Sequence, residues 1–193
     1  SHPSIAYWNT AVRLGFFLIV NHLVGRVRQE LIRVRELSQR DPLTGATNRR
    51  YFGELAEVEL ARLARNGRPL SLAYIDLDNF KTVNDSMGHE AGDQVLTTVV
   101  RLMRENLRRP DVVARIGGDE FLLMMPETGL SQAQSVLQRL LEACRTKMEE
   151  NGWPIGMSIG AITTDQPAEL EDLIRGADAQ MYISKQSGKN RAS

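Results

Sequence analysis

The chain has 193 residues, enough for one ordinary domain and an appendage. Its hydrophobic share of 42% supports a packed core, and 24 basic residues balance 24 acidic ones. This balance gives no reason to expect a nucleic-acid polymer as partner. The chain begins Ser-His without a Met, which is typical of a trimmed chain rather than a whole protein.

Residues 1–40 differ in character from the rest and predict an N-terminal helical stem. The apolar run 14–20 is too short to cross a bilayer alone, because a span needs about 20 apolar residues. Aromatic and basic side chains flank it, as at the cytoplasmic end of a longer membrane helix: Tyr7, Trp8, Arg26, Arg28, Arg33 and Arg35. An amphipathic soluble helix explains the same run equally well, and both interpretations are open.

Apolar residues then recur in alternating steps of four and three, at Val20, Val24, Val27, Leu31 and Val34. This heptad spacing predicts a short parallel coiled coil, and a helix packed on its own domain is the alternative. The segment 41–45 contains Pro and Gly, which end the helix. The second domain is therefore expected over residues 41–193.

Helices and strands alternate through that domain. Apolar periodicity predicts strands at 71–76 and 155–163 and helices at 49–66, 91–107, 131–149 and 168–185. Residues 112–125 predict a hairpin, because the pair Gly117-Gly118 allows a tight turn. The expected fold class is α/β (α+β), a mixed sheet with one antiparallel hairpin, covered by helices.

The single cysteine, Cys144, excludes an internal disulfide and is typical of a reducing compartment. It lies at helical spacing among apolar residues, so we expect a buried structural thiol rather than a nucleophile.

Three acidic residues are expected near one edge of the sheet. Asp76 ends the strand 71–76, and Asp119 and Glu120 follow the glycine pair. If the two strands are neighbours, their carboxylates converge and can hold two magnesium ions against a triphosphate. An ordinary acidic hairpin turn is the alternative. We expect Asp78 to point away from Asp76, as a supporting or surface acid.

Residues 79–96 are polar, contain glycine and lead into a helix, which is typical of a ligand-binding loop. Asn84 and Asp93 can together read a guanine, the amide at its acceptor edge and the carboxylate at its donor edge. A turn former and a first-turn helix acid are the alternatives. Lys81 suits a phosphate or a solvated surface, and His89 suits a ribose, a phosphate or a structural hydrogen bond.

The end of the last predicted helix carries Lys185 and, beyond Gly188, Lys189. The helix dipole alone favours lysines there, and glycine is a common residue at a helix C-terminus.

Together these pieces resemble the GGDEF family of diguanylate cyclases, bacterial enzymes that join two GTP molecules into cyclic di-GMP. The resemblance covers residues 41–191 in the family's order. Its pieces are Asp41-Pro-Leu-Thr-Gly45, Asn48-Arg-Arg50, Asp76-Leu-Asp78-Asn-Phe-Lys81, Asn84-Asp85, Gly88-His89, Gly92-Asp93, Gly117 through Phe121, Tyr182, Lys185 and Gly188-Lys-Asn190. It implies a palm-like sheet, as in nucleotide cyclases and polymerases.

The resemblance also implies catalytic and metal-binding roles. Asp76 and Asp119 correspond to the side-chain ligands of two Mg²⁺ ions, for which Mn²⁺ is a substitute, and Leu77 to a backbone-carbonyl ligand. Glu120 corresponds to an acid that assists the second metal or accepts the proton of the ribose 3′-hydroxyl. Lys81 corresponds to a lysine that stabilises the phosphate or the transition state.

Substrate and product contacts follow in the same way. Asn84 and Asp93 match the guanine-reading pair, with His89 as a further substrate contact between them. Lys185 and Lys189 match triphosphate contacts, although arginine is also common at the second position. The resemblance assigns Arg108 and Asp111 to a product-inhibition site for cyclic di-GMP, whereas a basic helix end closed by Pro110 is the alternative.

The implied function is a diguanylate cyclase in which two domains, each holding one GTP, face each other in a homodimer. A coiled-coil stem would raise the effective concentration of one site at the other. The alternatives are a catalytically silent module that binds GTP or cyclic di-GMP, and a cyclase of mixed base choice, against which Asp93 argues. We expect a cytoplasmic catalytic domain, with an inner-membrane anchor of the full-length protein left open.

Overall fold

In the computed structural model, residues 12–26, 29 and 39–186 are described. The chain divides into two compact units, residues 1–38 and 39–193. In the first unit residues 12–26 are helical. The heptad positions Val27, Leu31 and Val34 and the flanking Tyr7, Trp8, Arg28, Arg33 and Arg35 lie outside the described residues. None of the helices within the described ranges has the length and apolar character needed for a membrane span.

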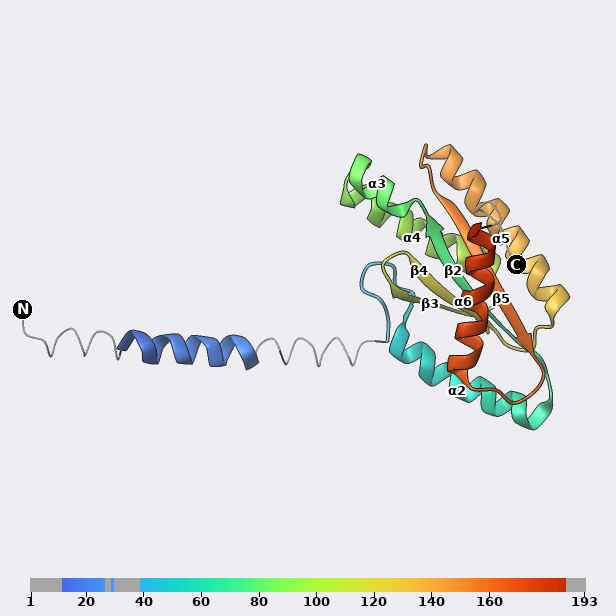
Figure 1. Cartoon of the computed structure of the whole chain (residues 1–193), viewed down its shortest axis with the longest axis horizontal. Coiled ribbons are helices and arrows are strands. Elements are labelled where there is room, and N and C mark those ends of the chain that lie inside the picture. Colours follow the sequence, from blue (N-terminus) through green and yellow to red (C-terminus); the bar gives the residue numbers. More distant parts are fainter. Residues whose placement is uncertain (1–11, 27–28, 30–38, 187–193) are drawn as a thin grey trace, which may run out of the picture. The chain divides into compact units, whose positions relative to one another are not determined.

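A five-stranded mixed sheet forms the centre of the second unit (Figure 1). Its strand order is β1-β3-β4-β2-β5. β1 pairs parallel with β3, and the other neighbours pair antiparallel. The strands are β1 (Thr47–Asn48), β2 (Leu70–Asp78), β3 (Val112–Gly117), β4 (Glu120–Met125) and β5 (Gly156–Thr164). The expected mixed sheet with one hairpin is confirmed, while the two-residue β1 is too short for a periodicity to predict.

Helices cover both faces of this sheet because β2 is apolar on both sides. Leu72 and Tyr74 pack in a cluster with α2 and α6, whereas Ala73 and Ile75 pack in a cluster with α3, α4 and α5. This alternation follows the two-residue period of a strand. The helices are α2 (Arg49–Asn66), α3 (Phe80–Met87), α4 (His89–Asn106), α5 (Leu130–Glu150) and α6 (Leu170–Gln186). Cys144 is buried in α5, and burial raises the pKa of its thiol to about 12, so the structural role is confirmed.

The predicted polar loop between β2 and the next helix is wrong, because most of it is the helix α3. Val83 on this helix is fully buried and Phe80 packs against the core, whereas its other side chains are polar or exposed. Phe80, Val83 and Met87 follow a helical spacing, but eight residues are shorter than the window over which a helical period can be established from sequence. Gly88, with φ of 86°, separates α3 from α4, which begins two residues earlier than predicted.

α6 lies against the backbone of β5 at Gly160. A Cβ atom on Gly160 would stand 1.9 Å from the backbone nitrogen of Met181, so glycine is required for this close approach. One turn further along, the hydroxyl of Ser184 donates to the carbonyl of Ile159 at 3.1 Å. The next residue, Lys185, lies in the last turn of α6.

Candidate active site

The acidic residues lie side by side where the two inner strands β2 and β4 meet at one end of the sheet. β2 and β4 are neighbours, and Asp76 is paired directly opposite Glu120 in their register. The hairpin turn brings Asp119 to the same place, because the amide of Leu77 donates to the Asp119 carbonyl at 3.2 Å. The structure therefore brings together the three acids and Leu77, which the sequence could connect only through an assumed strand pairing.

Two further side chains hold these acids. Nζ of Lys185 lies 2.7 Å from Oδ1 of Asp76, and the hydroxyl of Tyr74 donates to Oε1 of Glu120 at 2.9 Å. Burial, and then the neighbouring Glu120 carboxylate, raise the pKa of Tyr74, so its hydroxyl keeps the proton that it donates. Sequence reasoning missed Tyr74, although its position two residues before Asp76 places both on one face of the strand.

The surroundings of Asp119 change the pKa of its carboxyl. Burial raises the pKa of its carboxyl above the ordinary 3.8, and the charges of Asp76 and Glu120 raise it further, whereas a backbone hydrogen bond and Lys185 act in the opposite direction. Carboxylate oxygens are the donors that Mg²⁺ prefers, so the donor chemistry fits this ion. Within residues 12–26, 29 and 39–186, however, no three His, Cys, Asp or Glu side chains already form a metal-binding group.

Asp78 is not a surface acid, and the expectation that it points away from Asp76 is wrong. Residues two apart in a strand share a face, so Asp78 lies on the same face as Asp76. Its side chain is only 3% exposed and accepts a hydrogen bond of 2.8 Å from the hydroxyl of Ser158 on β5. Asp78 is therefore a buried acid that ties the end of β2 to β5.

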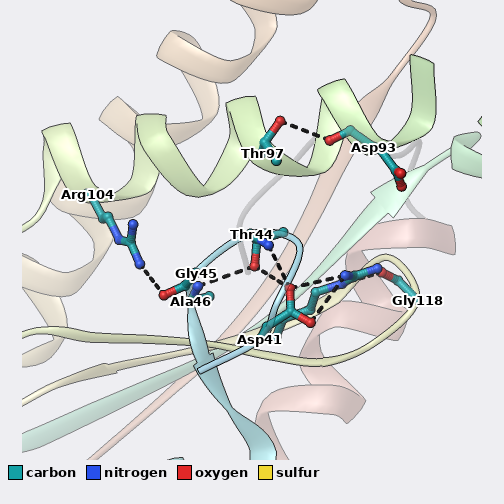
Figure 2. A network of polar contacts seen from close by, with 9 residues as sticks. Asp41, Thr44, Gly45, Ala46, Asp93, Thr97, Arg104 and Gly118 are labelled. Carbon is teal, nitrogen blue, oxygen red and sulfur yellow. Dashed lines mark hydrogen bonds and ion pairs between the residues drawn. The ribbon is translucent and has the colours of Figure 1, made fainter. Parts of the chain in front are cut away.

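The predicted guanine-reading residues come from two consecutive helices. Asn84 lies on α3, and a Cβ atom on Gly92 of α4 would stand 2.1 Å from its Oδ1. Gly92 thus leaves the space that the half-buried Asn84 side chain occupies. Asp93 follows directly on α4, where its carboxylate is exposed and its backbone carbonyl accepts from Thr97 (Figure 2). Lys81 and His89 are exposed on the same pair of helices, and Lys189 lies outside the described residues.

The first residues of the domain contact the hairpin. Figure 2 shows Asp41 receiving hydrogen bonds from the backbone and hydroxyl of Thr44, at 2.8 and 2.6 Å. Arg115 of β3 bonds the same carboxylate at 3.2 Å and the carbonyl of Gly118 at 2.9 Å. Burial opposes ionisation of Asp41, but these hydrogen bonds outweigh it and hold its pKa below the ordinary 3.8. The sequence analysis used Asp41 as a domain boundary and as part of a family motif, but it assigned no partner to Asp41 and missed Arg115.

The predicted inhibitory pair, Arg108 and Asp111, forms a closed turn. The backbone amide of Arg108 donates to Asp111 at 2.8 Å, and its guanidinium lies 3.3 Å from the same carboxylate. That guanidinium also donates to Thr128, which ties the turn to the loop before α5. A cavity of about 500 Å³ adjoins the turn, and three more arginines line it: Arg40, Arg104 and Arg109. Arg40 and Arg104 come from distant segments, and no sequence pattern indicates that they meet here.

Comparisons with known proteins agree with this geometry. Residues 38–191 match the family model described as diguanylate cyclase, GGDEF domain. Over 160 residues the chain is 37% identical to the diguanylate cyclase DgcP of Pseudomonas aeruginosa, covering 81% of this chain and 24% of DgcP. Over 176 residues it is 34% identical to the cyclic di-GMP phosphodiesterase NbdA of the same species, covering 90% of this chain and 22% of NbdA. The chain thus spans about a quarter of the length of these curated relatives.

Among solved structures, the coiled coil and GGDEF domain of DgcB from Caulobacter crescentus, in complex with c-di-GMP, matches with a TM-score of 0.74 at 27% identity. The match covers 92% of this chain and 96% of DgcB's. The family model covers most of the chain and includes both acidic strand ends. The chain belongs to the GGDEF family of diguanylate cyclases.

Proposed function

We propose that this chain condenses two GTP molecules into cyclic di-GMP and two pyrophosphates. The observation that carries the proposal is the pairing of Asp76 with Glu120 across two antiparallel strands, with Lys185 of α6 at 2.7 Å from Asp76. Acids and a lysine at one sheet edge suit a reaction in which charged phosphates must be held and neutralised. Family membership and the relative DgcP support the same reaction.

In the proposed reaction, the 3′-oxygen of each GTP forms a bond to the α-phosphorus of the other. The bond from each of these phosphorus atoms to its pyrophosphate oxygen breaks, so two pyrophosphates leave, and the proton of each 3′-hydroxyl passes to Glu120 of one of the two domains. Tyr74 holds the Glu120 carboxylate through its hydrogen bond of 2.9 Å. Lys81, Lys185 and Lys189 stabilise phosphate charge, and Asn84, His89 and Asp93 hold the guanosine.

Asp76, Asp119 and Glu120, with the carbonyl of Leu77, are the groups that would hold two Mg²⁺ ions, or Mn²⁺ in their place. When bound, the ions would neutralise the triphosphate. Burial is the main cause that raises the pKa of Asp119, and the charges of Asp76 and Glu120 add to it, so a cation bound there would favour the ionised carboxylate. Lys185 lies on Asp76 in this structure, so we propose that its ammonium moves to the substrate phosphates when a cation arrives.

Each domain is proposed to hold one GTP, so the reaction needs two domains facing each other in a homodimer. Cyclic di-GMP is proposed to inhibit the enzyme at the Arg108–Asp111 turn, drawing on the arginines around the adjoining cavity. The complex of DgcB with c-di-GMP supports binding of this product by a protein of the family.

The second candidate is a catalytically silent module that binds GTP or cyclic di-GMP. Two observations favour it: NbdA is named a phosphodiesterase, and the acids of the described part do not form a ready metal-binding group. Incubation with GTP and Mg²⁺, followed by chromatography of the products, separates the two. Cyclic di-GMP and pyrophosphate in a ratio of one to two support the cyclase, whereas saturable GTP binding without product supports the silent module.

A further inference from the structure

A second cavity, of about 860 Å³, lies between α2, α6 and the sheet, and of its lining residues only Tyr74 and Glu120 have a role in the proposed reaction. The two helices cover the same face of the sheet (Figure 1). Apolar side chains from both helices and from β3 and β4 line it: Phe52, Ile116, Leu122, Leu170 and Ile174. Its volume falls within the range of about 300–1,000 Å³ typical of small-molecule sites.

Gly53 on α2 keeps this cavity open. A glycine inside a helix costs about 1 kcal/mol relative to alanine, so it needs a reason. Close packing is not that reason, because a Cβ atom on Gly53 would meet nothing within 4 Å. Gly53 lines the cavity, and any longer side chain there would enter the space.

Arg49 is the lining residue that can attract an anion. Three arginines line the cavity, Arg49, Arg50 and Arg175, together with two glutamates, Glu120 and Glu171. Arg50 and Arg175 pair with Glu54 and Asp172, but both pairs are exposed and therefore weak. The guanidinium of Arg49 has no ion-pair partner among the described residues.

We propose that this cavity is a binding site for a small molecule with a flat apolar body and one anionic group. The apolar body lies on Ile116 and Ile174, which line the cavity and are partly exposed, and the anionic group meets Arg49 at the mouth. Glu120 and Tyr74 form part of the wall, so the occupant lies beside the candidate active site. The inference does not depend on the catalytic proposal, and a binding measurement tests it without turnover.

The test uses the full chain with methyl-labelled isoleucine and leucine, titrated with naphthalene-2-sulfonate and followed by NMR. The methyl signals of Ile116, Leu122 and Ile174 are expected to shift together along one binding curve. Those of Leu130 and Leu137, which line a separate groove beside α5, are expected to stay in place. The neutral analogue naphthalen-2-ylmethanol is expected to bind about ten-fold more weakly, a difference of about 1.4 kcal/mol.

Two test variants and one control variant sharpen the result. Gly53→Leu fills the cavity and is expected to abolish the shifts, whereas Glu57→Leu, at an exposed position of the same helix, is expected to keep them. Arg49→Ala, also exposed, is expected to remove the preference for the sulfonate and keeps the test decisive if Gly53→Leu fails to fold. Shifts that persist in Gly53→Leu, shifts spread over Leu130 and Leu137, or equal affinity for the charged and neutral probes would overturn the proposal.

Discussion

Lys185 and Asp76 are joined by an ion pair of 2.7 Å between the last turn of α6 and the end of β2. The side chains are 30% and 14% exposed, so the pair is partly shielded from water. It places a cation from near the end of the domain directly against an acid from its first long strand. The close approach of α6 to β5 at Gly160 makes this contact possible.

Lys185→Gln is expected to lower kcat/KM for GTP by about 100-fold. The substitution removes a charge-assisted contact to phosphate, of a class worth about 1.5–3 kcal/mol. Pyrophosphate release under GTP titration measures the effect. Gln186→Ala, at the neighbouring exposed position, serves as control and should match the parent protein. Activity of Lys185→Gln within three-fold of the parent would exclude the proposed phosphate contact.

Tyr74→Phe removes only the hydroxyl that donates to Glu120. We expect the free energy of unfolding to fall by about 0.5–1.5 kcal/mol, the usual worth of one hydrogen bond. If Tyr74 positions the carboxylate that accepts the proton, kcat should fall about ten-fold while KM for GTP stays within two-fold. Urea unfolding and steady-state kinetics measure the two effects. A loss of stability with unchanged kcat would show that the contact is structural only.

Asp119→Asn is expected to make the protein more stable at pH 7 and inactive. The pKa of Asp119 is raised by folding, so the folded state binds its proton more tightly than the unfolded state. The parent protein therefore loses stability as pH rises from 3.8 through the raised pKa, and the asparagine variant does not. Urea midpoints across this range should show an advantage of the variant that vanishes towards acid pH. A variant less stable than its parent at pH 7 would contradict this account.

Asp41→Asn is expected to have the opposite pH dependence. The pKa of Asp41 is lowered by folding, so its ionised form stabilises the protein above 3.8, and this stability is lost as pH falls through the native pKa. We expect a loss of about 1–2 kcal/mol at pH 7, from charge-assisted bonds to Thr44 and Arg115. The loss should shrink below pH 3.8. A difference that is constant with pH would point to altered packing instead.

Arg108→Ala tests the inhibitory site. We expect cyclic di-GMP to inhibit the variant at least about ten-fold more weakly, with turnover at low product unchanged. Stability should also fall by about 1 kcal/mol, because Arg108 donates to Thr128 and to the carbonyl of Pro126. Arg101→Ala, an exposed change on α4, should leave inhibition intact. Unchanged inhibition in Arg108→Ala would count against the site.

Much of the fold could be predicted from local patterns. The helix predicted at 49–66 matches α2, because apolar periods act over about ten residues. The expected hairpin forms, but its turn consists of Gly118 and Asp119, since Gly117 is still part of β3 and pairs with Glu120. α3 was missed because its eight residues are too short a window to establish a helical period. Asp78 was misplaced, since a strand's two-residue period puts it beside Asp76.

By itself, the sequence determined the family, the order of most elements and which acids, lysines and amides carry the candidate chemistry. Only the tertiary structure decided which side chains these acids contact. Tyr74 bonds Glu120 across 46 residues of sequence, and Arg115 bonds Asp41 across 74. It also decided that Arg40 and Arg104 join Arg108 around one cavity. Such contacts depend on strand register and on how helices pack against the sheet. These are properties of the whole chain, which no local window of residues encodes.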